Sequence, residues 1–236
     1  MAEEITMRIA FYGDSLIKGT PGVAFLDVLQ SMLSNHTLVN LGKGGDTVIS
    51  LWRRIEKRAQ APSDLAVLWV GVNDVLSTLS LSHSALKWLM RQPRARDLVE
   101  FRAYYHRILG RLRHSSDNIL TVSPLLIGEE LSNPWNRKLE ELCRIARSSA
   151  ASFDHTHYLD LRAELATRSV MREPSDYLPR SVTRILLDSL FLRDPAEIDR
   201  AATRRGLHLT LDGVHLSSRG ADEVAKLLRA AIEGLS

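Results

Sequence analysis

The amino-acid sequence predicts a three-layer α/β/α protein of one domain, residues 1–236, in which a parallel sheet lies between two layers of helices. Short apolar runs alternate along the chain with longer segments in which apolar residues recur every three or four positions, a pattern typical of alternating strands and helices. The strand-like runs are apolar almost throughout, as in parallel strands that are covered on both faces. The composition, 44% hydrophobic and 25% charged, suits a globular chain with a full core.

About five strands are expected. The first run, "MRIAFYG", is mostly apolar or aromatic and ends at a glycine, and the third, "LAVLWVGV", contains no charged residue. Such runs are typical of strands that are buried on both faces. The predicted strands are 7–13, 36–42, 65–72, 118–126 and 156–161.

Helices are expected between these strands and after the last one. Segments such as "TVISLWRRIEKRAQ" place apolar residues on one side of a helix and charged residues on the other. Before the first helix, the glycines and proline of "IKGTPG" predict a loop that delays its start. The predicted helices are 22–33, 47–60, 95–113, 134–151 and 217–233.

Two connections are longer than a minimal strand-to-helix link. Residues 76–94 follow the third strand, and residues 162–209 form a predicted helical insertion with breaks at Pro174, Pro179 and Pro195. Both leave from the carboxyl edge of the sheet, where parallel sheets bind ligands. They are therefore expected either to wall or cover a substrate pocket or to pack on the flank of the sheet, and both alternatives stay open.

Composition excludes several classes of protein. A formal charge of +3 without a clustered basic patch gives no indication of nucleic-acid binding. The single cysteine, Cys143, cannot form an internal disulfide and lies in a helical pattern, so a buried thiol in a reducing compartment is expected. No apolar run reaches the about 18 residues that a membrane span needs, and the N-terminus lacks the features of a signal peptide. We expect a cytoplasmic protein without a membrane span, and the oligomeric state stays open.

Polar or glycine-rich sequences follow several of the predicted strands. Asp14 and Ser15 end the first strand, "NLGKGGDT" ends the second, and Asn73 ends the third. Asp212 and His215 lie in "DGVH", just before the closing helix. Because the carboxyl ends of parallel strands meet at one edge of the sheet, these segments predict a single site there.

The residue types at this edge suit acyl transfer. A serine hydroxyl such as that of Ser15 becomes a nucleophile when a neighbouring base takes its proton, and an acid must orient that base. Asp212 precedes His215 by three residues on a turn, so the carboxylate can orient the imidazole while the other ring nitrogen faces Ser15. The backbone N–H groups of Ser15 and Gly45 and the side-chain amide of Asn73 would provide three donors for an oxyanion.

The blocks "GDSL", "GGDT", "GVND" and "DGVH", in this order, resemble the four blocks of the SGNH (GDSL-type) hydrolases, which are esterases and lipase-like enzymes. The resemblance spans residues 8 to about 233. It implies a flavodoxin-like sheet of five parallel strands and a serine esterase mechanism that uses no metal or cofactor. By position it implies Ser15 as the nucleophile and Asp212 and His215 as the rest of the catalytic triad. Gly45, which directly precedes "DT", and Asn73 match the oxyanion donors, together with the Ser15 amide.

The expected substrate is a small carboxylic ester, with short-chain acyl or acetyl esters as the first choice. An acyltransferase, a thioesterase or a carbohydrate deacetylase would use the same site. A different class, a flavodoxin-like module whose glycine loops hold a phosphate or nucleotide, lacks a Gly-x-x-x-x-Gly-Lys-Ser/Thr loop and leaves "DGVH" unexplained.

Individual residues also have simpler interpretations. Ser15 could instead cap a helix, and Asp14 and Asp46 are expected to bond backbone donors in turns. Position 17 is isoleucine, so Ser15 does not lie in the Gly-x-Ser-x-Gly elbow of α/β-hydrolases.

The remaining histidine, arginine and tryptophan candidates also have structural interpretations. His155 and His157 suggest a metal site, but without a further ligand at metal spacing a loop leading into a strand is favoured. Arg53 and Arg54 are expected on a solvated helix face. Among the tryptophans, Trp88 is the one expected to wall a pocket.

Overall fold

The computed structural model describes residues 6–167 and 175–235, and its centre is a five-stranded parallel sheet. The strand order is β2-β1-β3-β4-β5, and each neighbouring pair is parallel. This confirms the predicted fold class. The strands are β1 (Arg8–Gly13), β2 (Thr37–Gly42), β3 (Ser63–Trp69), β4 (Ser116–Val122) and β5 (Thr156–Leu159).

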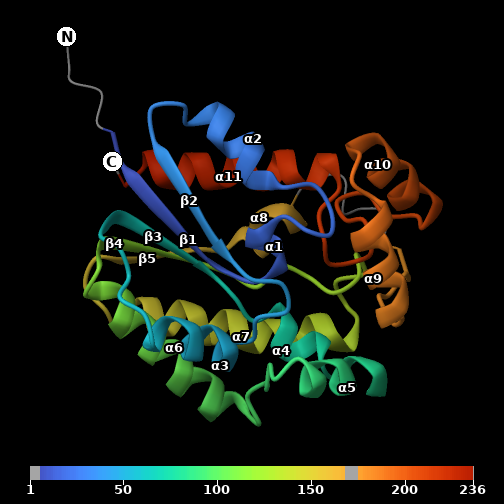
Figure 1. The fold of residues 1–236 in the computed structure, drawn as a ribbon, viewed down its shortest axis with the longest axis horizontal. Helices are drawn as coiled ribbons and strands as arrows, with labels where there is room; N and C mark the ends of the chain where they lie inside the picture. The colour runs from blue at the N-terminus through green and yellow to red at the C-terminus, as the bar shows by residue number, and fades with distance from the viewer. Residues whose placement is uncertain (1–5, 168–174, 236) are drawn as a thin grey trace.

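Helices cover both faces of the sheet (Figure 1). On one face lie α2 (Phe25–Met32) and α11 (Ser218–Glu233), with α8 (Leu161–Ala166) packed beside α11. The other face carries α3 (Val48–Glu56), α6 (Leu98–Arg113) and α7 (Pro134–Ala150). Five further helices of the described residues lie toward the carboxyl ends of the strands: α1 (Ser15–Lys18), α4 (Val72–Leu76), α5 (Leu81–Leu89), α9 (Val182–Phe191) and α10 (Pro195–Arg204).

The pleat of β1 explains why its sequence is apolar without alternation. Ile9 and Phe11 join the core beneath α2 and α11, while Ala10 and Tyr12 join the core beneath α3, α6 and α7. Successive side chains of a strand point to opposite faces, so a strand between two helical layers needs apolar residues at every position. β2 is an edge strand, and all its residues keep some exposure.

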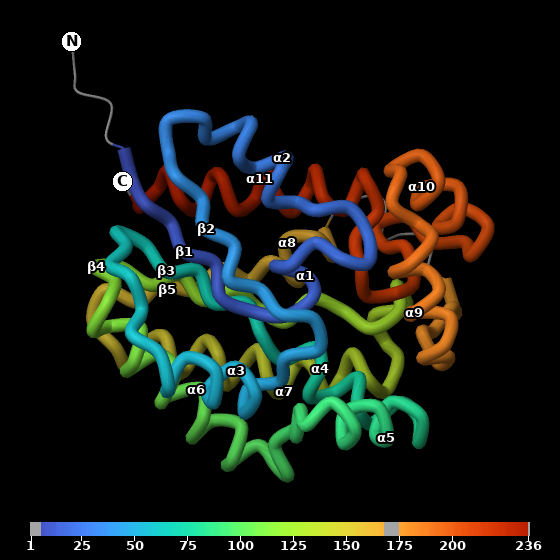
Figure 2. The backbone as a smooth tube through the Cα atoms, in the orientation of Figure 1, coloured from blue at the N-terminus to red at the C-terminus, as the bar shows by residue number. Residues whose placement is uncertain are grey.

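The chain turns earlier after β1 and β3 than the sequence predicts. The Asp14 carboxylate accepts the Leu16 N–H at 2.9 Å, so a single turn, α1, begins at Ser15 and includes Ile17 and Lys18 of the predicted loop. The rest of the predicted loop lies within residues 19–24, which do precede the longer helix α2. Gly19, at φ 76°, ends this single turn, and Figure 2 shows the loop that then leads into α2. The predicted strand 65–72 ends at Trp69, because Gly71 at φ 130° turns the chain into α4, which carries Asn73.

The two long connections form helices at the carboxyl end of the sheet. The segment 76–94 contains α5, and the segment 162–209 contains α9 and α10. Pro195 is the first residue of α10, where its missing N–H costs nothing, so it starts a helix there. Pro174 lies outside the described residues. None of the helices in residues 6–167 and 175–235 is long and apolar enough to cross a bilayer.

Gly220 in α11 offers a test of packing against intrinsic helix propensity. Alanine favours a helix over glycine by about 1 kcal/mol. A Cβ at position 220, however, would lie 1.9 Å from the Leu209 carbonyl oxygen. We expect Gly220→Ala to lower the free energy of unfolding by about 1–3 kcal/mol, the usual cost of overpacking, in urea titrations followed by circular dichroism.

Gly110→Ala in α6 is the matched control. A Cβ there meets only the Phe153 ring, at 4.0 Å, so the same change should raise the free energy of unfolding by about 0.5–1 kcal/mol. Equal stability of the two variants would contradict the packing argument.

Candidate active site

The residues that the sequence singles out come together at the carboxyl edge of the sheet. Ser15 is the first residue of α1, directly after β1, and Asn73 lies on α4 after β3. Gly45 lies in the loop between β2 and α3. Asp212 and His215 lie in the loop before α11. All of these except Asp212 line one cavity.

Ser15, His215 and Asp212 form a continuous hydrogen-bonded row. Ser15 Oγ lies 3.0 Å from His215 Nε2, and His215 Nδ1 lies 2.8 Å from Asp212 Oδ2. The other carboxylate oxygen of Asp212 accepts the backbone N–H groups of Val214 (3.1 Å) and His215 (2.9 Å). Because the carboxylate holds the proton on Nδ1, Nε2 is left to accept the serine hydroxyl proton.

Burial and pairing act in opposite directions on the pKa values of this pair. Burial raises the pKa of Asp212, but the charge and hydrogen bonds of His215 hold it below its ordinary value. Burial lowers the pKa of His215, but the Asp212 carboxylate raises it to above the ordinary value. The pair therefore favours an ionised carboxylate beside an imidazole that accepts a proton readily.

A second chain of hydrogen bonds fixes the Asn73 amide beside Ser15. Asp14 Oδ2 accepts Asn73 Nδ2 at 3.0 Å, and Asn73 Oδ1 accepts the Lys87 ammonium at 2.8 Å. A lysine can only donate, so the amide has one orientation in which both contacts form. Lys87 Nζ also donates to the Gly45 carbonyl oxygen at 2.5 Å, so one side chain holds both Asn73 and the Gly45 loop.

Lys87 escapes prediction from the sequence. Its only signal is that it is the one charged residue in the apolar helical run "SALKWLM". In the structure its side chain turns inward and is 8% exposed. Burial lowers the pKa of Lys87 to about 8, although the carboxylates of Asp14 and Asp74 raise it. Burial also raises the pKa of Asp14 to about 6 and that of Asp74 to about 7.

The loop after β2 needs glycine at position 45. Gly45 has φ +79°, and a Cβ there would lie 2.5 Å from Gln92 Oε1. Gln92 Nε2 in turn donates to the Gly44 carbonyl at 2.9 Å. Lys87 and Gln92, on α5 and just after it, therefore brace the loop from the outside.

Asp46 and Arg54 differ from their predicted roles. The Asp46 carboxylate accepts the Ser50 hydroxyl at 3.1 Å and Arg54 Nε at 2.9 Å, so its partners are side chains instead of backbone donors. The Arg54 side chain is only 22% exposed and is held by this ion pair, so the prediction of a solvated arginine is wrong. Asp14, by contrast, bonds the backbone donor that the sequence predicts.

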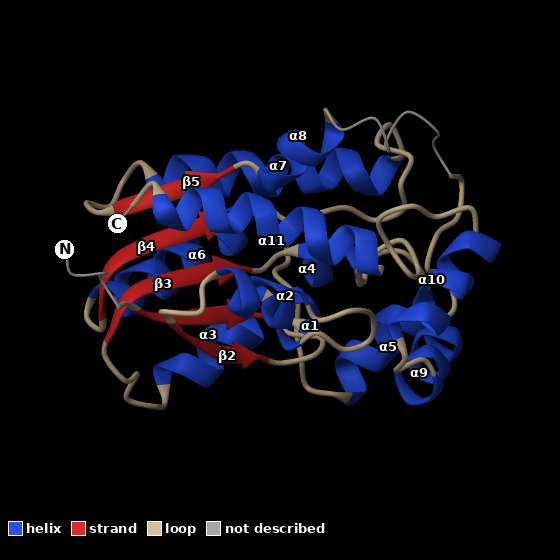
Figure 3. Ribbon diagram, turned by 90° about the horizontal axis from the view of Figure 1, so that it is seen from above, coloured by secondary structure: helices blue, strands red, loops and turns tan. Residues whose placement is uncertain are grey.

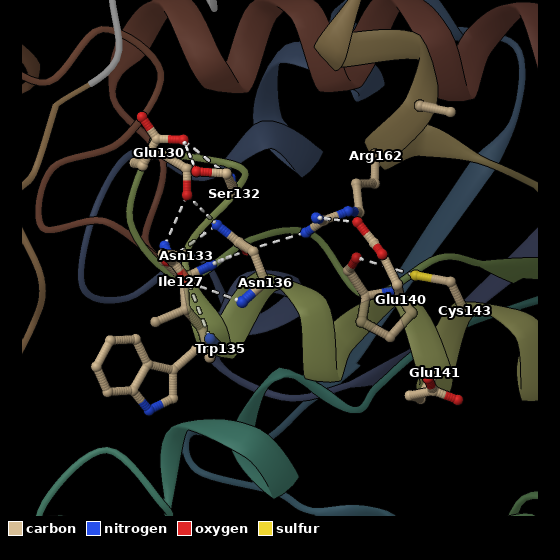
Figure 4. Close-up of polar contacts among 12 residues, drawn as sticks. Ile127, Glu130, Ser132, Asn133, Trp135, Asn136, Glu140, Glu141, Cys143 and Arg162 are labelled. Carbon is tan, nitrogen blue, oxygen red and sulfur yellow. Dashed lines mark hydrogen bonds and ion pairs between the residues drawn. The ribbon is translucent and has the colours of Figure 1, made fainter.

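The loop after β4 is held by the start of α7 (Figure 4). Asn133 caps that helix by accepting the Trp135 and Asn136 N–H groups. The buried Asn136 amide donates to the carbonyls of Ile127, Gly128 and Glu130 and accepts the N–H of Ile127. Its oxygen also accepts Arg162 Nη1 at 2.9 Å.

Glu129, in the middle of this loop, is a second residue that the sequence does not reveal. Its carboxylate is 2% exposed and accepts the N–H groups of His208, Leu209 and Thr210, each at 2.8 Å. It also accepts the Thr210 hydroxyl at 2.7 Å. Glu129 therefore fixes the start of the loop that carries Asp212 and His215.

The cavity at this edge has a volume of about 390 Å³, a usual size for a small-molecule site. One side is polar and holds Ser15 and His215. The lining also includes apolar residues from α4, α5 and α9 and the turn after α5, so both long connections contribute to an apolar wall: Leu76, Leu86, Met90, Val182, Ile185 and Leu186.

Trp88 does not line this cavity. Its side chain is 82% exposed and lines a separate surface depression with Arg91 and Arg94. Cys143 is buried, as predicted, and burial raises the pKa of its thiol to about 11. His155 lies in the turn before β5 and His157 on β5 itself. Within residues 6–167 and 175–235, no group of three or more histidine, cysteine or acidic side chains is arranged to hold a metal ion.

The comparison with known proteins agrees with the fold. The pattern of the GDSL-like lipase/acylhydrolase family matches residues 11–222. Among curated proteins, none matches the sequence.

Several solved structures are similar over nearly the whole chain. The acetyl xylan esterase AlAXEase has a TM-score of 0.66 at 22% identity, over 95% of this chain and 99% of its own. A mutant of the acetylxylan esterase Axe2 from Geobacillus stearothermophilus has a TM-score of 0.63 at 18% identity, over 96% and 94%. A lipase/acylhydrolase from Enterococcus faecalis has a TM-score of 0.64 at 17% identity, over 96% and 95%.

Glu129 tests whether the loop after β4 positions the loop of Asp212 and His215. Glu129→Gln places an amide against backbone donors, and loss of a buried hydrogen bond to a charged group costs about 1.5–3 kcal/mol. We expect lower stability in urea titrations and a lower kcat on a soluble ester. Glu130→Gln is the control, because that carboxylate bonds only Ser132 within its own loop. A kcat for Glu129→Gln equal to that of the control would refute the positioning role.

Proposed function

Because the chain belongs to the GDSL-like lipase/acylhydrolase family, we propose that it cleaves carboxylic esters through an acyl-enzyme on Ser15. The observation that carries the proposal is the row of Ser15, His215 and Asp212, whose contacts are 3.0 and 2.8 Å long. These distances lie within the range in which a base takes a proton from a nucleophile and an acid orients that base.

The mechanism proceeds in two halves. Ser15 Oγ attacks the ester carbonyl carbon while His215 Nε2 takes the hydroxyl proton, and Asp212 stabilises the imidazolium. The tetrahedral intermediate collapses, the bond from carbon to the leaving oxygen breaks, and His215 protonates the departing alcohol. A water molecule then attacks the acyl-enzyme with His215 again as base, which releases the acid and restores Ser15.

The oxyanion is held by the backbone N–H groups of Ser15 and Gly45 and by the Asn73 side chain. Asn73 Nδ2 uses one N–H for Asp14, and we assign the other to the oxyanion. Lys87 acts as a positioning residue, because it fixes both the Asn73 amide and the Gly45 loop. Its positive charge also favours negative charge that develops nearby.

Short-chain and acetyl esters are the first substrates to test, since acetyl xylan esterase is the activity named for two of the similar structures. A second candidate is an ester with a longer acyl chain, favoured by the apolar wall that α5 and α9 give the cavity. An acyltransferase, thioesterase or carbohydrate deacetylase would use the same acyl-enzyme. Products formed with and without an added alcohol separate transfer from hydrolysis, and a panel of acetyl, butyryl and octanoyl esters measures the depth of the pocket.

Replacement of the nucleophile and of one oxyanion donor tests the assignment. Ser15→Ala should reduce hydrolysis of p-nitrophenyl acetate to near the background rate and abolish labelling by a fluorophosphonate. Asn73→Ala should retain labelling but lower kcat by about 10²–10³. If the wild-type chain is neither labelled nor faster than Ser15→Ala on any ester of the panel, the esterase proposal is wrong.

The pH profile tests His215 and Lys87 separately. The imidazole must be neutral to act as a base, so kcat/KM should rise as pH passes upward through the pKa of His215, which Asp212 holds above its ordinary value despite burial. The pKa of Lys87 is lowered to about 8 by burial, so the ammonium charge beside Asn73 is lost above that pH and activity should fall.

Lys87→Met should have a lower maximum and lack the falling limb near pH 8. Lys43→Met is the control, because Lys43 also lines the cavity but is exposed and should leave that limb in place. A falling limb that persists in Lys87→Met would contradict the role given to this lysine.

A further inference from the structure

Two helices at the mouth of the cavity expose an unusual number of large apolar side chains. α5 and α9 contact each other and lie together beyond the carboxyl ends of the strands (Figure 3). Trp88 is 82% exposed and Phe191 is 72% exposed. We define the α5/α9 face as the exposed apolar residues of these helices and the turn after α5: Leu81, Trp88, Leu89, Met90, Leu186, Leu187, Leu190 and Phe191. Large exposed apolar side chains that gather on two contacting helices mark an interaction site.

Most of the exposed charges that flank this face are positive, with Asp194, next to Arg193, as an exception. Residues 75–96 contain no aspartate or glutamate but include Arg91 and Arg94, both exposed. Arg180, Arg184 and Arg193 flank or lie on α9 and are also exposed.

The Asp188 carboxylate on α9 does not reduce this excess of positive charge. The Asp188 side chain is 6% exposed and is ion-paired with Arg205 at 2.8 Å, so its charge is compensated within the protein. The surface that surrounds the apolar residues therefore complements a negatively charged partner.

The face is continuous with the interior of the cavity. Met90 and Leu186 belong to both, because each lines the cavity and each is about half exposed at the surface. Leu86 and Ile185 are half-buried and line the same cavity as Ser15. Among the described residues that line the cavity there is no aspartate or glutamate, while Lys18 and Lys43 are present. An apolar chain can thus pass from the face toward Ser15 along apolar side chains.

We propose that the α5/α9 face docks on an anionic lipid surface and that the ester substrate is a lipid-like molecule drawn from that surface. Leucine, phenylalanine and tryptophan side chains surrounded by arginines are the combination that inserts into the headgroup region of such a surface. A second copy of the chain fits less well, because a symmetric contact would bring arginines against arginines. The substrate part of this inference rests on the esterase function proposed above, whereas the docking part does not.

Vesicle binding by the Ser15→Ala chain tests docking without any turnover. We expect co-sedimentation with mixed phosphatidylcholine–phosphatidylglycerol vesicles, weaker binding to pure phosphatidylcholine, and loss of binding as salt is raised. The double variant Trp88→Ser/Phe191→Ser should bind about tenfold more weakly, since it removes two large apolar side chains from the interface. Val99→Ser, at an exposed position of α6 outside the face, should bind as the parent does.

The substrate part is tested with the active chain. Trp88 and Phe191 do not line the cavity, so their double variant should hydrolyse a soluble butyryl ester at the parent rate. Against a fatty-acyl ester carried in anionic vesicles its rate should fall about tenfold, in line with the weaker binding.

Each of the remaining outcomes refutes one part of the proposal. Failure to bind anionic vesicles, or equal binding by the double variant, refutes docking, and self-association through this face in sedimentation velocity would then assign it to a second copy. Equal binding to both vesicle types refutes the role of the arginines. Equal rates of parent and double variant on the vesicle-borne ester refute the lipid substrate. Vesicle binding by a chain that hydrolyses no ester refutes the esterase function and leaves docking intact.

Discussion

A buried carboxylate is tolerated only when its oxygens are hydrogen bonded or ion-paired. Five such carboxylates lie at the carboxyl edge of this sheet. Three of them, Asp14, Asp74 and Glu129, join segments that are far apart in the sequence, and Asp46 and Asp212 fix local turns. Asp14 caps α1 and holds Asn73, Asp74 accepts the N–H groups of Val48 and Ala95, and Asp46 holds Arg54. Glu129 and Asp212 fix the two ends of the turn that carries His215. The geometry of the site thus follows from the hydrogen bonds of these buried carboxylates, which fix the segments around Ser15.

The sequence predicts what depends on local pattern. Apolar runs between amphipathic segments indicate the sheet, and short blocks at the strand ends indicate Ser15, Asn73 and His215, because each block is contiguous in sequence. The sequence does not reveal the roles of Lys87 and Glu129, because their hydrogen-bond partners lie 14 to 81 residues away and no local pattern indicates such a contact. The sequence alone does not show which pocket Trp88 lines, because the helix phase of α5 is set by Lys87 turning inward, and that follows from the tertiary structure.

The long connections separate chemistry from recognition. The row of Ser15, His215 and Asp212 depends on the sheet and on the loops at its edge. The apolar wall of the cavity and the exposed face both come from α5 and α9, which lie in the two segments that exceed a minimal connection. Changes in these segments can therefore alter what reaches Ser15 without disturbing the groups that act on it, which is how one fold comes to serve many substrates.

α5 carries an inward lysine and an outward tryptophan at consecutive positions, Lys87 and Trp88. Consecutive residues of an α-helix are rotated by about 100° around its axis. The insertion or deletion of a single residue before Lys87 would turn the ammonium away from Asn73. A deletion would put Trp88 in the place of Lys87, and an insertion would put Leu86 there. Related sequences should therefore vary in length only in the turns on either side of this helix. The register of α5 therefore constrains sequence change in this helix, beyond the identity of any residue that acts on the substrate.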